Sequence, residues 1–124
     1  MGPTKEAMGA LAHFGRVFSA PGFSAGRWAD DGPYFEQAPE LSDFVQAAYE
    51  GGFILRDFDW PAWAEVGKQI EADPARLAEA DLDTVQKLLT CHIRSERFSE
   101  GHLSGAIADG RLVRLLARLA MLAS

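Results

Sequence analysis

Apolar residues recur at steps of three and four along most of this chain, which is the spacing of one face of an α-helix. Glycine and proline fall between the apolar runs and mark the places where helices end. The pattern predicts helices over the ranges 4–18, 40–50, 60–72, 74–79, 84–97, 99–108 and 111–122. The sequence is therefore expected to be all-α, a compact bundle of about six helices in which the last three form the organising unit.

Short polar residues stand at the beginnings of these ranges, where a side-chain oxygen can accept a hydrogen bond from a free helical amide. The residues expected to open helices in this way are Thr4, Asp59, Asp73, Asp83 and Ser99. Asp83 with Gln86 three residues later resembles a capping box, and Phe58 is placed to pack against Trp63. These features fix the expected starts of the helices.

Two segments do not fit a helix. Residues 19–39 form a Gly/Pro-rich loop. Its aromatic residues, which are expected to fold it back onto the body of the protein, are Phe23, Trp28, Tyr34 and Phe35. Residues 53–58 are apolar but too short for periodicity to decide, and a lone strand has no partner, so an extended and mostly buried connector is expected. We expect residues 1–124 to form a single helical domain.

A polar pair lies on what should otherwise be a core face. Within the range 84–97, His92 and Glu96 point to the same side as Val85 and Leu88. Burying either group without a partner costs several kcal/mol. One interpretation is structural: Glu96 accepts a hydrogen bond from His92, from amides at the start of the next helix, or from an arginine of the last helix. The other is a ligand site.

The ligand-site interpretation rests on four residues close in sequence, His92, Glu96, Arg97 and His102. An imidazole, a carboxylate and a guanidinium at a helix start suit a small anionic ligand. The neighbouring arginine opposes a metal cation, and the spacing matches no zinc pattern, so we expect neither a metal nor a cofactor. Cys91 is adjacent to His92 but points about 100° away from it along a helix, which argues against a nucleophilic pair.

A stripe of arginines runs along the last predicted helix, at Arg111, Arg114 and Arg118, opposite its leucines. Residues 1–83 hold six Lys/Arg and fifteen Asp/Glu, a net charge of −9, and residues 84–124 hold six and three, a net charge of +3, which together give −6. The acidic part of the chain, or solvent, could balance the positive charge of the arginine stripe. Alternatively, the stripe could bind nucleic acid. The overall charge disfavours a protein whose whole surface binds nucleic acid.

Composition restricts the remaining classes of function. One cysteine excludes an intramolecular disulfide, and no apolar run is long enough to span a bilayer, so a cytoplasmic protein without membrane contact is expected. Phosphate loops, nucleophile elbows, HExxH and CxxC are absent from the sequence. The leading interpretation is a non-enzymatic binding or interaction module, either a homodimer or a partner of another protein. The alternatives are a nucleic-acid regulator using the arginine stripe and an enzyme on an anionic small molecule using the His92 and Glu96 cluster.

Two motifs carry a resemblance. They are Phe-Asp-Trp-Pro-x-Trp at 58–63 and Arg-Phe-x-x-Gly-His-Leu at 97–103. With the sequence around them, over about residues 40–119, the chain resembles a prokaryotic family known only as a domain of unknown function. The resemblance implies a small, mostly helical protein and brings no activity, cofactor or catalytic residue. The first forty residues take no clear part in it.

Overall fold

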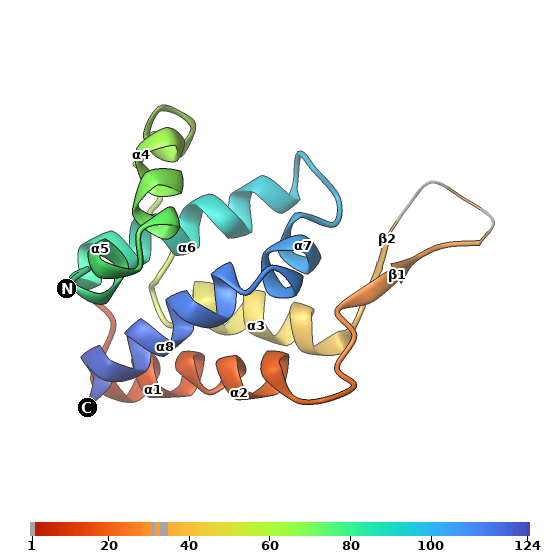
Figure 1. Cartoon of the computed structure of the whole chain (residues 1–124), viewed down its shortest axis with the longest axis horizontal. Coiled ribbons are helices and arrows are strands. Elements are labelled where there is room, and N and C mark those ends of the chain that lie inside the picture. The colour runs from red at the N-terminus through yellow and green to blue at the C-terminus, as the bar shows by residue number, and fades with distance from the viewer. Residues whose placement is uncertain (1, 31, 33–34) are drawn as a thin grey trace.

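Helices make up most of the protein and pack together, with a short hairpin projecting at one end (Figure 1). The computed structural model describes residues 2–30, 32 and 35–124. Its elements are α1 (Lys5–Ala12), α2 (Phe14–Ser19), β1 (Gly26–Trp28), β2 (Phe35–Gln37), α3 (Pro39–Glu50), α4 (Trp60–Ala72), α5 (Pro74–Ala78), α6 (Leu82–Glu96), α7 (His102–Ala108) and α8 (Arg111–Ala123). The predicted fold class, a compact and mostly helical bundle, is confirmed.

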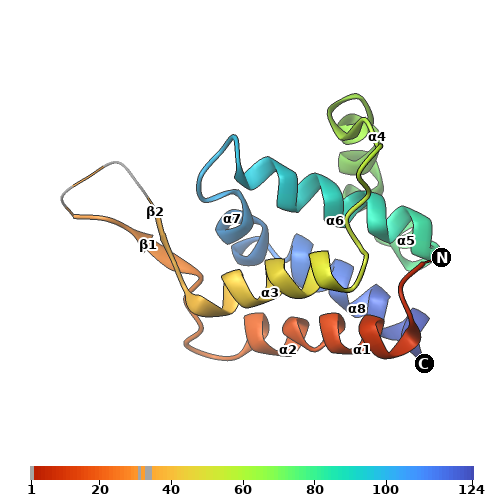
Figure 2. The same ribbon diagram turned by 180° about the vertical axis from the view of Figure 1, so that it is seen from behind.

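Helix α8 lies at the centre of the packing. Its leucines at 112, 115, 116 and 119 are fully buried, and the helix contacts α1 and α2 on one side and α6 and α7 on the other. The backbones of α2 and α8 approach closely, since a Cβ on Gly15 would lie 3.3 Å from Leu116 Cβ. The two views of the ribbon show α1 and α2 running along α3, with α8 crossing obliquely and α6 above them (Figures 1 and 2). Of the three helices predicted to organise the bundle, α8 is the central one.

The first predicted helix is present as two segments in line with each other, α1 and α2, which meet at His13. Thr4 caps α1 as expected and accepts a hydrogen bond from the Ala7 amide at 3.0 Å. The inward side of α2 contributes to an aromatic cluster with α3. The rings of this cluster, with centroids 5.4–5.8 Å apart, belong to Phe14, Phe18, Phe23 and Phe44. Phe23 thereby holds the start of the Gly/Pro-rich segment against the core.

Part of the segment predicted as a loop over 19–39 is a two-stranded antiparallel sheet. Trp28 of β1 pairs with Phe35 of β2, and the Phe35 amide donates a 2.9 Å hydrogen bond to Glu100 in the α6–α7 turn. Trp28 is 55% exposed and packs edge-on against the Phe35 ring. Tyr34, the remaining aromatic residue of this segment, lies outside the described residues. Three-residue strands are too short to give the alternation that sequence analysis needs.

The connector at 53–58 is largely buried at its start, where Phe53 and Ile54 enter the core. It is fastened to α6 by side chains. The Leu55 amide donates to Thr90 Oγ1 at 3.1 Å, and Gln86 Nε2 donates to the Gly52 carbonyl at 3.2 Å. The chain then enters α4, whose cap at Asp59 and whose Phe58–Trp63 contact, 5.7 Å between ring centroids, are as predicted.

Two helix starts differ from the prediction. Helix α6 begins at Leu82 because Asp81, and not Asp83, accepts the 2.9 Å hydrogen bond from the Thr84 amide. Helix α7 begins at His102 after Gly101, whose φ of +87° favours glycine, so the predicted cap at Ser99 is wrong. The amides at the start of α7 are satisfied from α6 instead, as described below.

Asp81→Ala should therefore lower the free energy of unfolding by about 1 kcal/mol, the usual loss when a helix N-cap is removed. Asp83→Ala is the matched control, since Asp83 only forms an exposed ion pair with Lys87 at 3.1 Å and should cost a few tenths of a kcal/mol. Urea denaturation of both variants measures the difference. Equal losses would contradict the assignment of Asp81 as the cap.

Candidate functional site

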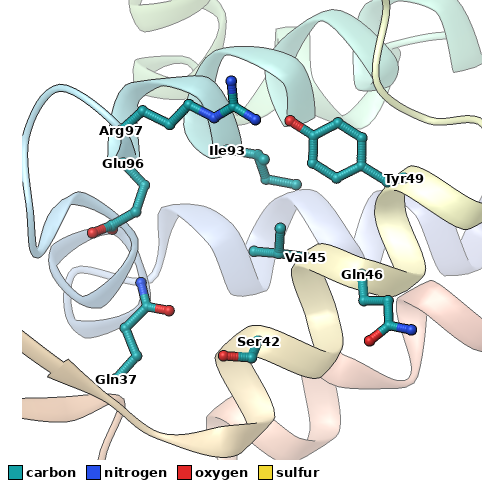
Figure 3. A pocket seen from close by; sticks show the side chains of 8 residues that line it. All are labelled: Gln37, Ser42, Val45, Gln46, Tyr49, Ile93, Glu96 and Arg97. Atoms are coloured by element: carbon teal, nitrogen blue, oxygen red, sulfur yellow. The ribbon is translucent and has the colours of Figure 1, made fainter.

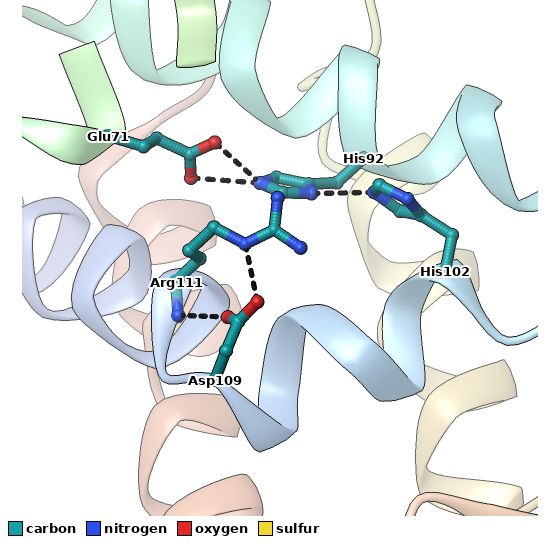
Figure 4. A network of polar contacts seen from close by, with 5 residues as sticks. All are labelled: Glu71, His92, His102, Asp109 and Arg111. Atoms are coloured by element: carbon teal, nitrogen blue, oxygen red, sulfur yellow. Dashed lines mark hydrogen bonds and ion pairs between the residues drawn. The ribbon is translucent and has the colours of Figure 1, made fainter. Parts of the chain in front are cut away.

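A chain of three polar side chains links α4, α6 and α7 inside the protein (Figure 4). His92 Nε2 lies 3.1 and 2.9 Å from the two carboxylate oxygens of Glu71. His92 Nδ1 lies 3.0 Å from Nε2 of His102. Glu71 is 9% exposed and His92 is 3% exposed, so both groups are removed from water. Each is buried with a hydrogen-bonding partner, which offsets the cost of burial.

The hydrogen bonds restrict where the protons lie. An ionised carboxylate only accepts, so His92 donates its Nε2–H to Glu71. The contact between His92 and His102 holds one proton, which belongs either to His92 Nδ1 or to His102 Nε2. Burial, followed by electrostatic repulsion from the neighbouring His92 and Arg111, lowers the pKa of His102 from 6.5 to about 4. His102 is therefore neutral near pH 7.

Arg111 lies over this chain at the first turn of α8 (Figure 4). Asp109 holds it there, because its carboxylate accepts from the Arg111 amide at 3.0 Å and from Arg111 Nε at 2.8 Å. Burial alone would raise the pKa of the Asp109 carboxyl, but the hydrogen bonds from Arg111 outweigh it and lower that pKa. The charge of Asp109 is thus committed to Arg111.

A cleft of about 380 Å³ opens between α4 and the beginning of α8. Its lining residues are Lys68, Glu71, Ala72, Asp109, Arg111 and Arg114. A smaller cavity of about 50 Å³ shares Lys68, Glu71 and Arg111 with the cleft and reaches His92 and His102. Three cations face two carboxylates here; buried Glu71 is hydrogen-bonded to His92, and exposed Asp109 is paired with Arg111 at the rim. The cleft therefore favours negative charge.

Glu96 has a different partner from His92. Its two oxygens accept hydrogen bonds from the amides of Gly101 at 3.0 Å and Leu103 at 2.9 Å. These amides open α7 and have no partner within that helix. Among the structural partners considered from the sequence, Glu96 takes the amides at the start of the next helix, and it acts as the cap that Ser99 does not provide.

The four residues predicted as one ligand cluster are divided between two places. His92 and His102 meet beside the cleft. Glu96 and Arg97 instead line a pocket of about 350 Å³ between α3 and the end of α6 (Figure 3). The two places lie on different sides of α6, and Glu96, which helical spacing puts only about 40° from His92, lines the pocket and not the cavity, so the prediction of one shared cluster is wrong.

The arginine stripe of α8 is also divided. Arg111 and Arg114 line the cleft, and Arg114 is exposed. Arg118 Nε donates a 2.8 Å hydrogen bond to the Ala80 carbonyl just after α5. One of the three guanidinium groups is therefore engaged in holding α5 against α8.

Sequence analysis missed Glu71, Lys68 and Asp109. The sequence does contain a sign that Glu71 is buried. Glu71 lies four positions after Gly67 and next to Ile70, so the helical repeat places all three on the inward side of α4. The partner of an inward histidine could have been sought among such inward acids. Lys68 and Asp109 are solvent-facing in the pattern and carry no comparable signal.

The site offers little for nucleophilic or metal chemistry. Burial, with the negative charge of Glu71, raises the pKa of the Cys91 thiol to about 11, so the thiol stays protonated near pH 7. Within residues 2–30, 32 and 35–124, no three His, Cys, Asp or Glu side chains are arranged to hold a metal ion.

The lowered pKa of His102 makes stability depend on pH. Between pH 6.5 and about 4, His102 binds a proton in the unfolded chain but not in the folded protein. The part of the unfolding free energy that comes from neutral His102 is therefore fully present above pH 6.5 and is lost as pH falls to about 4. His102→Gln should lose less unfolding free energy than the wild type between about pH 7 and about pH 5. His13→Gln, at an exposed histidine, is the control and should follow the wild type. Urea denaturation at several pH values measures both, and a His102→Gln slope equal to the wild-type slope would contradict the assignment.

Comparison with known proteins agrees with the resemblance seen in the sequence and extends it. The model of a family described as "Family of unknown function (DUF6508)" matches residues 3–124, which includes all but two of the first forty residues. No curated protein and no solved structure matches the chain. No helix in the described part of the chain is both long and apolar enough to cross a membrane. The chain belongs to this family of unknown function.

Proposed function

We propose that this protein is a non-enzymatic binding module that holds a small anionic ligand in the cleft between α4 and α8. One observation carries the proposal. Lys68 from α4 and Arg111 and Arg114 from α8 converge on a cleft of about 380 Å³. Its two carboxylates are hydrogen-bonded to His92 and to Arg111, which leaves Lys68 and Arg114 as the cleft cations without an acidic partner among the described residues. Ligand pockets fall in this range of volume.

The chemistry of the lining suits a phosphate, a sulfate or a similar oxyanion. Guanidinium groups bind such anions with two parallel hydrogen bonds, and a lysine adds a point charge. At the beginning of α8 the Arg111 amide is bonded to Asp109, and the N-cap, Gly110, has no side chain to cap the amides that follow. Gly110 also leaves room for the arginine: a Cβ there would lie 2.8 Å from Arg114 Nη1.

A small ligand fits these contacts better than nucleic acid does. Arg118 is engaged with the Ala80 carbonyl, and Arg111 is paired with Asp109, so the stripe does not present three equivalent cations along one face. A binding role also fits better than catalysis on an anionic substrate. The Cys91 thiol stays protonated, and His92 spends both ring nitrogens on Glu71 and His102.

Pyrophosphate at low ionic strength is a suitable probe, followed by isothermal titration calorimetry. We expect saturable binding that weakens about tenfold in Arg114→Ala and in Lys68→Ala, because each removes one charge-assisted contact. Arg56→Ala removes an exposed arginine from the connector and should leave the affinity unchanged. Absence of saturable binding, or equal weakening in all three variants, would refute a specific anion site.

Anion binding should also take up a proton. Burial chiefly lowers the pKa of His102 and repulsion from Arg111 adds to it; a negative ligand beside Arg111 offsets the repulsion, so the pKa of His102 rises on binding. Sulfate, which stays fully ionised, should therefore bind more tightly at about pH 5 than at about pH 7. The gain should disappear in His102→Gln and persist in His13→Gln. A pH-independent affinity in the wild type would show that His102 does not sense the ligand.

A further inference from the structure

A second pocket lies on the other side of α6 from the cleft, between α3 and the C-terminal end of α6 (Figure 3). It measures about 350 Å³, and β2 closes one end with Gln37. None of its lining residues belongs to the cleft or to the small cavity beside His92. It is therefore a separate site, and its occupancy does not depend on the proposed anion cleft.

One wall of this pocket is a stripe along α3. Its residues, at the spacing of one helical face, are Ser42, Val45, Gln46 and Tyr49. Such a stripe normally packs against a neighbouring helix. Here Tyr49 remains 40% exposed, and Val45 is only half-buried. The opposite wall is α6, where Ile93 is buried at the base and Arg97 stands at the rim.

The pocket has one acidic and one basic side chain among the described residues, and only the basic one is available to a ligand. Glu96 is its only acidic lining residue, and both of its oxygens accept hydrogen bonds from the amides of α7. Arg97 is its only basic lining residue, and among the described residues its guanidinium has neither an ion pair nor a hydrogen bond. The Tyr49 hydroxyl lies on the same side of the pocket as this guanidinium (Figure 3). A ligand therefore meets one available cation and one available hydroxyl above an apolar base.

We propose that this pocket binds a small organic carboxylate with an apolar or aromatic body. Arg97 holds the carboxylate through two parallel hydrogen bonds, and the Tyr49 hydroxyl donates a third. Val45 and Ile93 contact the apolar body, while the Ser42 hydroxyl serves a polar substituent at the far end. The combination of an apolar surface with few convergent polar groups is typical of small-molecule sites.

Benzoate is the probe for this proposal, titrated into the isotopically labelled protein and followed by backbone amide shifts. We expect saturable shifts confined to residues 42–49 and 93–97. Arg97→Ala should weaken the affinity about tenfold and Tyr49→Phe about threefold, because the first change removes the paired charge-assisted hydrogen bonds and the second removes a single hydroxyl donor. Arg56→Ala is the matched control and should bind benzoate as the wild type does. Arg97 is exposed, so its replacement should leave the fold intact, which the same spectra report.

Two comparisons make the test specific. Benzamide has the shape of benzoate without its charge and should bind at least about tenfold more weakly. Pyrophosphate should leave residues 42–49 unshifted, because it lacks an apolar body. Benzamide binding as tightly as benzoate, an unchanged affinity in Arg97→Ala, or shifts outside this pocket would each overturn the proposal.

Discussion

The hydrogen-bonded contact between Glu71 and His92 fixes how three helices meet. A buried carboxylate without a partner costs several kcal/mol, and here both oxygens of Glu71 in α4 face His92 in α6. The other nitrogen of His92 faces His102 in α7. Removing any one of these groups leaves the next one buried and incompletely satisfied. The placement of α4 and α7 against α6 therefore depends on this chain of contacts.

The same contact shapes the surface chemistry. Glu71 turns its charge inward to His92 and Asp109 turns its charge to Arg111, so the cleft above them presents cations. The pocket on the other side of α6 follows the same logic. Glu96 is committed to the amides of α7, which leaves Arg97 as the available charge. In a chain with a net charge of −6, the acids of these two pockets serve contacts within the protein, which is why we propose negative ligands for both.

Helical periodicity predicted most of the fold, because amphipathic spacing and end signals are local in sequence. It placed the stretch that became α6, the Asp59 cap and the Phe58–Trp63 contact. It chose Asp83 over Asp81 because only Asp83 is followed three residues later by a glutamine, but in the structure Asp81 accepts the hydrogen bond from the Thr84 amide. It gave no strands within 19–39, because a ladder of three residues on each side leaves no alternation to detect.

The sequence by itself determined that His92 faces inward and needs a partner, since both properties follow from the helical repeat and the cost of burial; Glu96, predicted on the same face, is only half-buried. Only the tertiary structure decided who the partners are. Glu71 stands 21 residues before His92, and its arrival depends on how α4 crosses α6. Local spacing carries no information about such crossings, because many helix-packing angles bury the same apolar stripe.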